Sequence, residues 1–288
     1  MIDSFEPHRE FLVRLAYRML GSLAEAEDAV QETWLRLERT ESADVANPRG
    51  WLTTVIARIC LDMLRTRTSR REEPLPAGPD PHTGTRADAE QELVLADSVG
   101  LALLVVLDKL DPAERLAFVL HDLCGIAFDE IAPIVSRSAD ATRQLASRAR
   151  RRVQGSRPPE SELANQRQVI EAFTVALRRG DVAGLIAILD PQVVVSADVG
   201  GAVRETQGAE TAARNWVAGA TAFEKFASHM TLALVDGSVG IVLAPKGRLF
   251  RVLRFTFEGG RIARAEIITD RARLAALDIA ALDAVTSP

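Results

Sequence analysis

The spacing of the apolar residues changes along this 288-residue chain, and the change limits what each part can fold into. Up to about residue 157 the apolar residues recur every three or four positions, as on the buried face of an α-helix. From about residue 190 they alternate with polar residues or form short β-branched runs, which are typical of strands. We therefore predict helical domains in the first part and a small α+β domain in the last.

Several helices are predicted before residue 71. The first ends at Gly21, and the second begins at a capping box formed by Ser22 and Glu25. Asn47 and Pro48 have the order of an N-cap and a first-turn proline, so they predict the start of a third helix. Residues 72–88 are too rich in proline and glycine for a helix or a central strand, and we interpret them as a linker.

A second group of helices is predicted between residues 89 and 155. Helical spacing resumes over residues 89–110, and Asp111, Pro112 and Glu114 then repeat the order of cap, first-turn proline and capping glutamate. Gly125 ends that helix. Residues 156–163 form a shorter linker, which leaves residues 164–288 for the α+β domain.

The segment from Ser138 to Arg152 is laid out like the second helix of a helix-turn-helix, which reaches base edges in the major groove of DNA. Ser138 is placed as the N-cap, and an inward stripe is predicted at Ala141, Leu145 and Ala149. The residues then expected to point outward are Thr142, Arg143, Ser147, Arg148, Arg150, Arg151 and Arg152. Arginines near a helix C-terminus also suit the helix dipole and a solvated surface, so the pattern alone leaves both interpretations open.

The last part is predicted to place helices ahead of and between strands. Helices are expected over residues 169–179, 182–189 and 209–218. A first strand begins at VVVSAD, and further strands are expected over residues 230–235, 239–243, 249–257 and 262–269. A final helix is predicted from Arg271 to Leu282.

The composition excludes several classes of protein. A formal net charge of −5 argues against a chain that coats nucleic acid everywhere and favours local basic patches, such as residues 65–71 and 143–157. Cys60 and Cys124 lie in apolar helical patterns and are expected to be buried. The four histidines lack the spacing of a zinc site, so we expect no metal and no cofactor. The sequence shows no leader and no long apolar run, so we expect a cytoplasmic protein.

Some segments carry a resemblance to a known family. The sequences HREFLVRLAYRMLGSLAEAEDAVQETWLRL and NPRGWLTTVIARICLDMLR look like sigma domain two, and LDKLDPAERLAFVLHDLCGIAFDEIAPIVSRSADATRQLASRARRRV looks like sigma domain four. Together they resemble the extracytoplasmic function (ECF) RNA polymerase sigma factors. The part containing FTVALRRGDVAGLIAILDPQVVVSADVGG resembles a SnoaL-like domain of the nuclear transport factor two-like fold, as in the SigJ-like subgroup of that family.

The resemblance implies an order of domains and their partners. It places sigma domain two at residues 1–71, a linker at 72–88, sigma domain four at 89–155, a linker at 156–163 and a SnoaL-like regulatory domain at 164–288. Domain two would bind the β′ clamp helices of core RNA polymerase and read and melt the minus-ten promoter element. Domain four would contact the β flap and read the minus-thirty-five element. The chain would then be an alternative sigma factor for transcription initiation and not an enzyme.

The resemblance also assigns residues to these contacts. The polymerase-binding positions are Asp28, Gln31, Glu32 and Arg36. The positions for minus-ten DNA are Asn47, Arg49, Trp51, Arg58, Asp62 and Arg65. The positions for minus-thirty-five DNA are Ser138, Thr142, Arg143, Gln144, Ser147, Arg148 and Arg151. Trp51 also belongs to the apolar stripe of its helix, so core packing explains it as well as base stacking does.

The helix before Ser138 departs from the family pattern. Ala127 stands where a capping serine is usual, Pro133 lies inside the helix and Ser136 replaces the usual turn glycine. An alanine cap forfeits about 1 kcal/mol, and an interior proline costs about 3 kcal/mol. We expect packing to preserve the fold, and the angle of the recognition helix and its promoter sequence stay open.

For the C-terminal domain the resemblance implies a face toward the sigma domains, formed by Asp198, Gly200, Gly201 and Asp270. We expect this domain to regulate the sigma domains in cis in place of a separate anti-sigma factor, with a small-molecule ligand as one option. The side chains that could serve acid–base chemistry form no short motif, so catalysis is not expected; they are Asp190, Asp198, Glu210, His229 and Asp270.

An alternative from a different class is a one-component helix-turn-helix regulator whose C-terminal domain senses a metabolite. Such a protein would bind duplex DNA alone, whereas a sigma factor would act with core polymerase. The predicted polymerase-facing helix favours the sigma factor.

Overall fold

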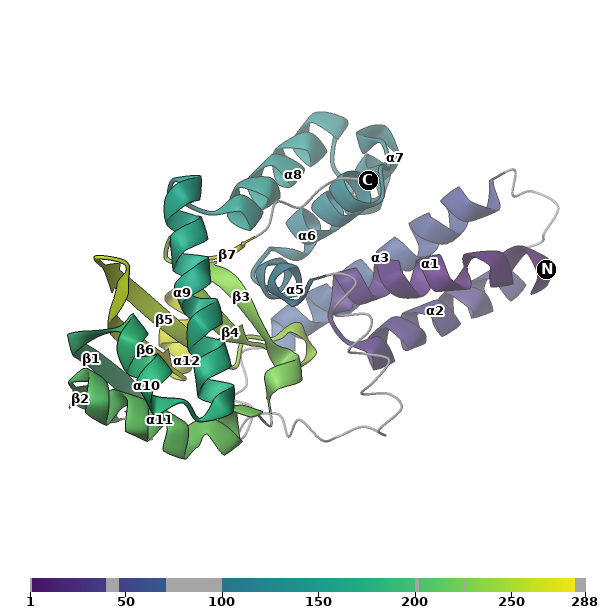
Figure 1. Cartoon of the computed structure of the whole chain (residues 1–288). Helices are drawn as coiled ribbons and strands as arrows, with labels where there is room; N and C mark the ends of the chain where they lie inside the picture. The colour runs from purple at the N-terminus through teal and green to yellow at the C-terminus, as the bar shows by residue number, and fades with distance from the viewer. Residues whose placement is uncertain (1, 40–46, 71–99, 200–201, 225, 283–288) are drawn as a thin grey trace. The chain divides into compact units, whose positions relative to one another are not determined.

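The computed structural model describes residues 2–39, 47–70, 100–199, 202–224 and 226–282 (Figure 1). The chain divides into two compact units: the first extends to Val153, and the second contains most of the chain from Gln154 onward. The linker predicted at residues 72–88 and the first part of the helix predicted at 89–110 lie outside the described residues.

The N-terminal part of the first unit is built from α1 (Ile2–Leu20), α2 (Leu23–Glu38) and α3 (Pro48–Arg70), which pack against one another. Gly21 has a left-handed φ of +74° between α1 and α2. Ser22 then caps α2, because its side chain accepts a hydrogen bond from the N–H of Glu25. The start predicted for α2 is therefore confirmed, and α3 begins at Pro48 as predicted.

The rest of the first unit contains α5 (Leu101–Asp108), α6 (Pro112–Phe118), the π-helical turn η2 (Val119–Leu123), α7 (Phe128–Val135) and α8 (Ala139–Gln154). The first-turn proline of α6 and the N-cap position of Asp111 are confirmed, but the predicted side-chain capping is wrong. The side chain of Asp111 makes no capping hydrogen bond, and Glu114 is buried and turned toward α8. Arg115 is also buried and donates to the carbonyl oxygen of Arg18 at 3.1 Å, which fastens α6 to the last turn of α1.

The second unit begins with α9 (Glu160–Arg179) and α10 (Val182–Ile188), and α11 (Ala209–Glu224) follows the first pair of strands. The short turns η3 (Ala227–His229) and η4 (Pro245–Gly247) and the helix α12 (Arg271–Ala276) lie between later strands. Helices are thus found in each of the regions predicted for α9, α10 and α11, but the linker predicted at 156–163 is wrong in part, because α9 already begins at Glu160. Gly180 ends α9 with a left-handed φ of +65°, directly after the last residue of the helix predicted over 169–179.

The described strands of the second unit form a seven-stranded sheet in the order β2-β1-β6-β5-β4-β3-β7. Their bounds are β1 (Leu189–Val199), β2 (Ala202–Gln207), β3 (Met230–Val235), β4 (Ser238–Leu243), β5 (Arg251–Glu258), β6 (Arg261–Ile268) and β7 (Ile279–Ala281). Neighbours are antiparallel except β1 and β6, which are parallel with Val195 opposite Ala265. This arrangement confirms the predicted α+β domain, and strands β3 to β6 form an antiparallel meander.

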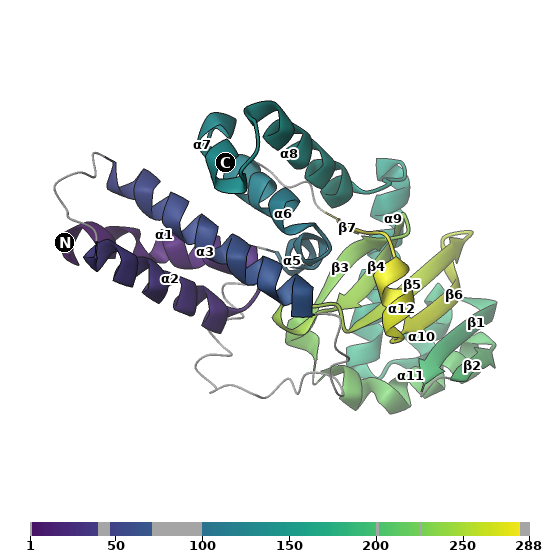
Figure 2. The same ribbon diagram turned by 180° about the vertical axis from the view of Figure 1, so that it is seen from behind.

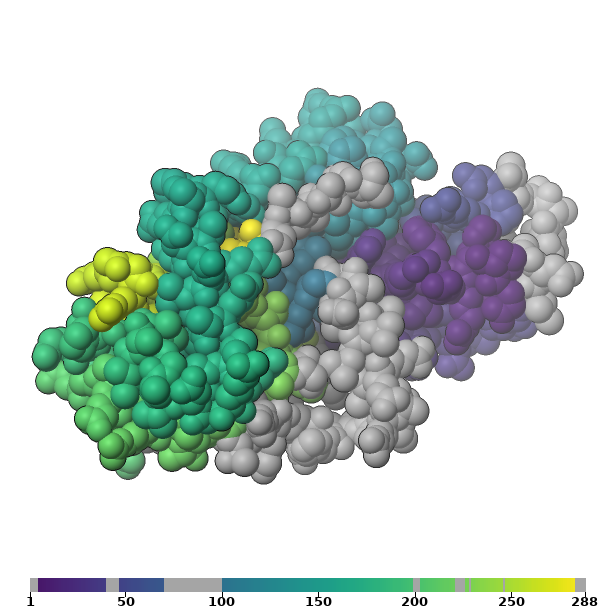
Figure 3. All heavy atoms as spheres, viewed as in Figure 1, coloured from purple at the N-terminus to yellow at the C-terminus, as the bar shows by residue number. Residues whose placement is uncertain are grey.

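Helices α9, α10 and α11 cover one face of this sheet, as the two opposite views show (Figures 1 and 2). In the space-filling view their atoms hide most of the strands behind them (Figure 3). Phe173 of α9 meets Trp216 of α11 and Phe255 of β5 edge-on, with ring centroids 4.9 and 5.5 Å apart. Edge-to-face aromatic pairs add to the stabilisation from apolar burial, so helices and sheet share one core.

The end of the second unit differs from the prediction. The spacing predicts one helix from Arg271 to Leu282, but α12 ends at Ala276 and β7 pairs with β3. Small apolar residues suit a buried strand as well as a helix, and here Ala281 lies opposite Ala233. Strand β2, with the exposed Val203, is likewise absent from the predictions.

Candidate nucleic-acid interface

Helix α8 has one buried and one exposed face. Its buried residues are Thr142, Ala146, Ala149 and Val153, whereas the predicted inward stripe was Ala141, Leu145 and Ala149. Ala149 is in both sets, and the centre of the buried face is turned from the predicted one by roughly 70°, less than the angle of about 100° between neighbouring residues. Ala141 and Leu145 are half-buried at the edge of the interface.

Most residues predicted to meet minus-thirty-five DNA lie on the exposed face of α8: Arg143, Gln144, Ser147, Arg148 and Arg151. Ser138 caps the helix, since its Oγ accepts a hydrogen bond from the N–H of Ala141 at 3.2 Å. The predicted outward orientation of Thr142 is wrong. Its side chain is fully buried and its hydroxyl donates to the carbonyl oxygen of Ser138 at 2.9 Å, so it packs inside the unit.

The arginines of α8 are held by acidic side chains of the helices beneath. Arg148 Nε lies 2.7 Å from Glu114 Oε1, and Arg152 Nη1 lies 3.0 Å from Glu114 Oε2. Arg150 pairs with Asp122 of η2. The sequence pattern treats Glu114 as a helix cap and therefore misses this role.

Arg143 near the start of α8 is supported in another way. It pairs with Asp140 one turn earlier, and its guanidinium carbon lies 5.8 Å from the ring centroid of Phe128. Phe128 in turn stacks on His121, with centroids 3.7 Å apart. A guanidinium over an aromatic face is attracted by the ring quadrupole, so this stack helps to orient Arg143.

The helix before α8 keeps its fold despite its unusual residues. Ala127 provides no side-chain cap, and Pro133 has no N–H to donate within α7. Ser136 takes the left-handed conformation with φ +57° at the turn where the family usually has glycine. Burial of Ile131 and Ile134 holds α7 in place, as expected from the sequence.

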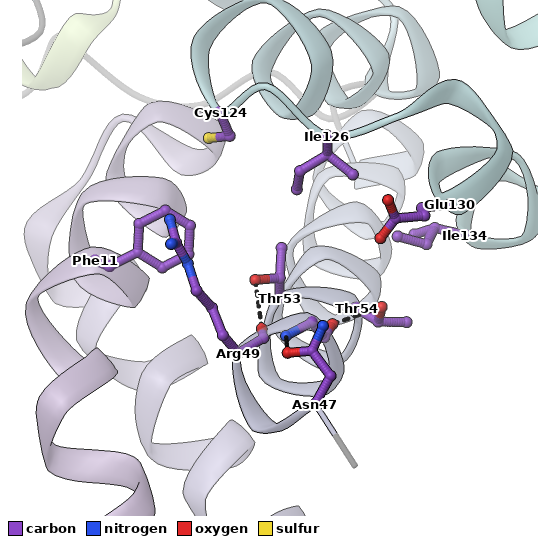
Figure 4. A pocket seen from close by; sticks show the side chains of 10 residues that line it. Phe11, Asn47, Arg49, Thr53, Thr54, Cys124, Ile126, Glu130 and Ile134 are labelled. Atoms are coloured by element: carbon purple, nitrogen blue, oxygen red, sulfur yellow. Dashed lines mark hydrogen bonds between the residues drawn. The ribbon is translucent and has the colours of Figure 1, made fainter. Parts of the chain in front are cut away.

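The start of α3 brings two predicted minus-ten residues to a pocket of about 220 Å³ (Figure 4). Asn47 caps the helix by accepting a hydrogen bond from the N–H of Gly50 at 3.0 Å. The guanidinium of Arg49 lies 4.7 Å from the centroid of Phe11, a residue that the sequence pattern does not single out. Residues from the region of α7 complete the lining: Cys124, Ile126, Glu130 and Ile134.

The cysteines do not give this pocket a reactive thiol. Burial raises the pKa of the Cys124 thiol above its ordinary value, and it raises the pKa of Cys60 to about 12. Both thiols are therefore protonated at neutral pH and are poor nucleophiles. Cys60 is buried as predicted, and Cys124 is half-buried.

The other predicted minus-ten residues follow one another along α3. Arg58, Asp62 and Arg65 are exposed, and Arg65 lies 3.7 Å from Asp62. Trp51 is half-buried, which is compatible both with core packing and with a base contact. Spacings of seven, four and three residues from Trp51 to Arg65 place these side chains on one face of the helix.

The polymerase-binding positions predicted on α2 lie on its outer face. Asp28, Gln31 and Arg36 are exposed, and Glu32 is half-buried and accepts a hydrogen bond from Arg36 at 3.0 Å. The opposite face of α2 carries the buried stripe that the sequence predicts, including Thr33 and Leu37. This face is therefore formed by polar side chains on a well-packed helix.

The predicted interdomain residues of the second unit take part in local bonds. Asp198 is 8% exposed and accepts hydrogen bonds from the N–H groups of Thr269 and Asp270 at 2.6 and 3.2 Å, with Arg273 nearby at 3.3 Å. Burial alone would raise the pKa of this carboxyl, but the hydrogen bonds from Thr269 and Asp270 and the charge of Arg273 hold it below its ordinary value. Asp270 caps α12. Gly200 and Gly201 lie outside the described residues.

The remaining acidic candidates of the second unit have structural partners. Asp190 accepts a hydrogen bond from the N–H of Gln192, and Glu210 pairs with Arg214 one turn later at 2.6 Å. Within the described ranges, no three histidine, cysteine or acidic side chains are grouped to hold a metal ion. No described helix has both the length and the hydropathy needed to cross a membrane.

Comparison with known proteins gives the class to which this arrangement belongs. The model of Sigma-70 region 2 matches residues 5–70, and the model of Sigma-70, region 4 matches residues 100–153. These matches cover α1 to α3 and α5 to α8, so the helices that carry the predicted DNA contacts are those of a sigma factor.

The relatives give the particular family. The probable ECF RNA polymerase sigma factor SigI of Mycobacterium tuberculosis is 36% identical over 283 residues, which cover 94% of this chain and 93% of the relative. The ECF RNA polymerase sigma factor SigJ of the same organism is 35% identical over 264 residues, covering 84% and 81%. The crystal structure of that SigJ is similar with 29% identity and a TM-score of 0.47, covering 94% of this chain and 97% of its own. This chain belongs to the ECF RNA polymerase sigma factors.

Family membership confirms the function expected from the resemblance. The chain is a transcription initiation factor whose regions 2 and 4 serve promoter recognition with RNA polymerase. The alternative of a one-component regulator is not favoured.

Proposed function

We propose that each surface of the first unit has a separate task in promoter recognition. The exposed face of α2 binds core RNA polymerase, the exposed face of α3 handles the non-template strand of the minus-ten element, and α8 enters the major groove at the minus-thirty-five element. The residues assigned to α8 are Ser138, Arg143, Gln144, Ser147, Arg148 and Arg151, without the buried Thr142.

The observation that carries the assignment of α8 is the division of its surface. Small buried residues form one face, while arginine, glutamine and serine side chains fill the other. Arginine and glutamine are the side chains that pair with guanine and adenine edges in the major groove, and arginine also neutralises phosphates. A helix that served only as a structural support would not need this concentration of donors on its exposed face.

We further propose that the C-terminal domain regulates the sigma domains in cis, so that no separate anti-sigma factor is required. This proposal is supported by the match to SigI, which runs over both units of the chain and not only over the sigma regions. A small molecule that binds the C-terminal domain is one way in which this regulation can respond to a signal.

Reconstitution with core RNA polymerase tests both proposals. The full chain should co-purify with core polymerase and direct transcription from its own promoter, and charge reversal at Asp28 and Arg36 should reduce binding to core. A chain truncated after Val153 should start transcription at a different rate from the full chain. Equal rates and equal polymerase affinity would remove the regulatory role, and duplex binding without any effect of polymerase would remove the assignment as a sigma factor.

A further inference from the structure

Glu114 is an unusually placed charge for a DNA-binding unit. It lies in the first turn of α6, its side chain is 3% exposed, and it does not contact the helix N-terminus as a cap. A carboxylate is almost never this buried unless it is paired. Both of its partners come from α8, and each carboxylate oxygen takes one guanidinium: Arg148 at 2.7 Å and Arg152 at 3.0 Å.

The two arginines keep a large part of their surface in solvent. The side chains of Arg148 and Arg152 are 45% and 52% exposed, although one nitrogen of each lies against Glu114. A guanidinium carries five N–H donors in one plane, so fixing one edge also fixes the direction of the others. Because the arginines are four residues apart, the carboxylate sets two such planes about 6 Å apart along the helix.

Stability alone does not explain this arrangement well. A well-packed apolar pair stabilises a protein as much as a buried ion pair, or more, because the ions must lose their water. What an apolar pair cannot do is orient two donor groups. The helix spacing places Arg148 on the exposed side of α8 with Gln144 and Arg151, and it places Arg152 at the flank of that side.

We infer that Glu114 is a positioning residue for recognition of the minus-thirty-five element: from beneath α8 it aims the guanidinium groups of Arg148 and Arg152 at the DNA. The inference rests on the proposed role of α8. Glu114 itself touches no DNA. Sequence discrimination therefore depends on a side chain in a different helix, outside the helix-turn-helix segment.

The negative charge of Glu114 makes it possible to distinguish positioning of the arginines from a purely electrostatic effect on DNA binding. A carboxylate behind the DNA-binding face weakens the attraction for phosphates, so Glu114→Gln should leave non-specific DNA affinity equal or slightly higher. If Glu114 positions the arginines, the same change should reduce discrimination between sequences. A simple gain of positive charge would raise all affinities together and leave discrimination unchanged.

The test uses the full chain with core RNA polymerase and a library of linear promoters whose minus-thirty-five hexamer is randomised. Transcripts are sequenced to rank the hexamers. Wild type should prefer a small set of hexamers, and Glu114→Gln should reduce the ratio between the best and the median hexamer at least tenfold, while total transcription from the library changes less. An unchanged ratio would overturn the inference.

Asp122→Asn is the matched control, because it removes another carboxylate–arginine pair between η2 and α8 but leaves Arg148 and Arg152 with Glu114. It should preserve the ranking of hexamers. If it flattens the ranking as much as Glu114→Gln does, loosening of α8 explains the effect and the inference fails. If wild type itself shows no preference among hexamers, the proposed role of α8 fails instead.

A second variant tests the inference if Glu114→Gln does not fold. The double change Arg148→Lys and Arg152→Lys keeps both positive charges near the carboxylate but removes the planar donors. It should flatten the hexamer ranking while the salt dependence of DNA binding stays at the wild-type value. A ranking like that of wild type would show that orientation of the guanidinium planes is unimportant.

Discussion

The two helices assigned to DNA, α3 and α8, present their arginines differently. On α8, Arg148 and Arg152 each pair with a buried carboxylate. On α3, Arg58 is exposed, and the partner of Arg65 among the described residues is the exposed Asp62 at 3.7 Å. Duplex DNA offers base edges in a fixed geometry, so donors aligned in advance suit it. A melted strand is flexible and is bound through phosphates and stacked bases, which adaptable side chains can follow. The comparison thus relates the fixed arginines of α8 to duplex DNA and the adaptable arginines of α3 to a melted strand.

The largest expected effect on stability comes from removing the arginine partners of Glu114. Replacing Arg148 and Arg152 by alanine leaves the Glu114 carboxylate without both guanidinium partners, which should lower the free energy of unfolding by about 3 kcal/mol. The matched double change of Arg58 and Arg65 to alanine on α3 should cost less than about 0.5 kcal/mol. Urea unfolding followed by circular dichroism measures both, and equal losses would break the comparison.

The turn into α8 gives the next effect. Ser136 has φ +57°, a conformation that costs a residue with a Cβ about 1–2 kcal/mol, whereas α3 begins at a capped Asn47 without such strain. Ser136→Gly should therefore raise the free energy of unfolding by about 1 kcal/mol. Ser147→Gly, within the helical part of α8, should lower it by a similar amount. If Ser136→Gly were less stable than the wild type, the serine side chain would have to make a stabilising contact.

Two substitutions of Asn47 distinguish its role as the cap of α3 from its proposed role in DNA contact. Asn47→Ala loses the hydrogen bond to Gly50 and should cost about 0.5 kcal/mol. Asn47→Asp keeps a capping oxygen but loses the amide donor and adds a negative charge toward DNA, so stability should hold while promoter melting declines. Permanganate reactivity of the minus-ten region with reconstituted holoenzyme measures melting. Wild-type melting by Asn47→Asp would assign Asn47 to capping alone.

The smallest effect concerns single phosphate contacts. Arg151→Ala should reduce the slope of log affinity against log salt by about 0.9, as expected for one contact with duplex DNA, whereas Arg58→Ala should reduce it by about 0.7, as expected for a single strand. Fluorescence anisotropy at several salt concentrations gives the slopes. Ser147→Ala is the uncharged control and should leave the slope unchanged.

The sequence predicts the helices of the first unit well because capping signals and apolar spacing act locally. Ser22, Asn47 and Pro112 all begin helices where their chemistry predicts. The predicted orientation of α8 is wrong by less than one residue. The spacing argument selects Leu145 over Thr142, while a buried threonine can satisfy its hydroxyl on the preceding turn. Apolar spacing and capping patterns cannot show that Thr142 is buried in place of Leu145.

The site is predictable only in part for a related reason. Exposed arginines can be found from helical spacing, but their partners come from distant segments: Glu114 lies 34 residues from Arg148, and Phe11 precedes Arg49 on another helix. The capping pattern even assigns Glu114 to a different task. In the second unit, β7 and the hydrogen bonds of Asp198 depend on strand pairing between distant segments, which periodicity does not reveal.

Asn47 and Arg49 at the start of α3 line the same pocket as Ile126 and Ile134, so the two groups of helices in the first unit lie next to each other. A compact chain of about 150 residues has a radius of gyration of about 15 Å. The centres of the two promoter elements lie about 25 base pairs apart, or roughly 85 Å along B-form DNA. The unit as described therefore cannot hold both elements at once. The 29 residues from 71 to 99 can span at most about 100 Å, so the length of the chain is compatible with the proposed contacts to both elements.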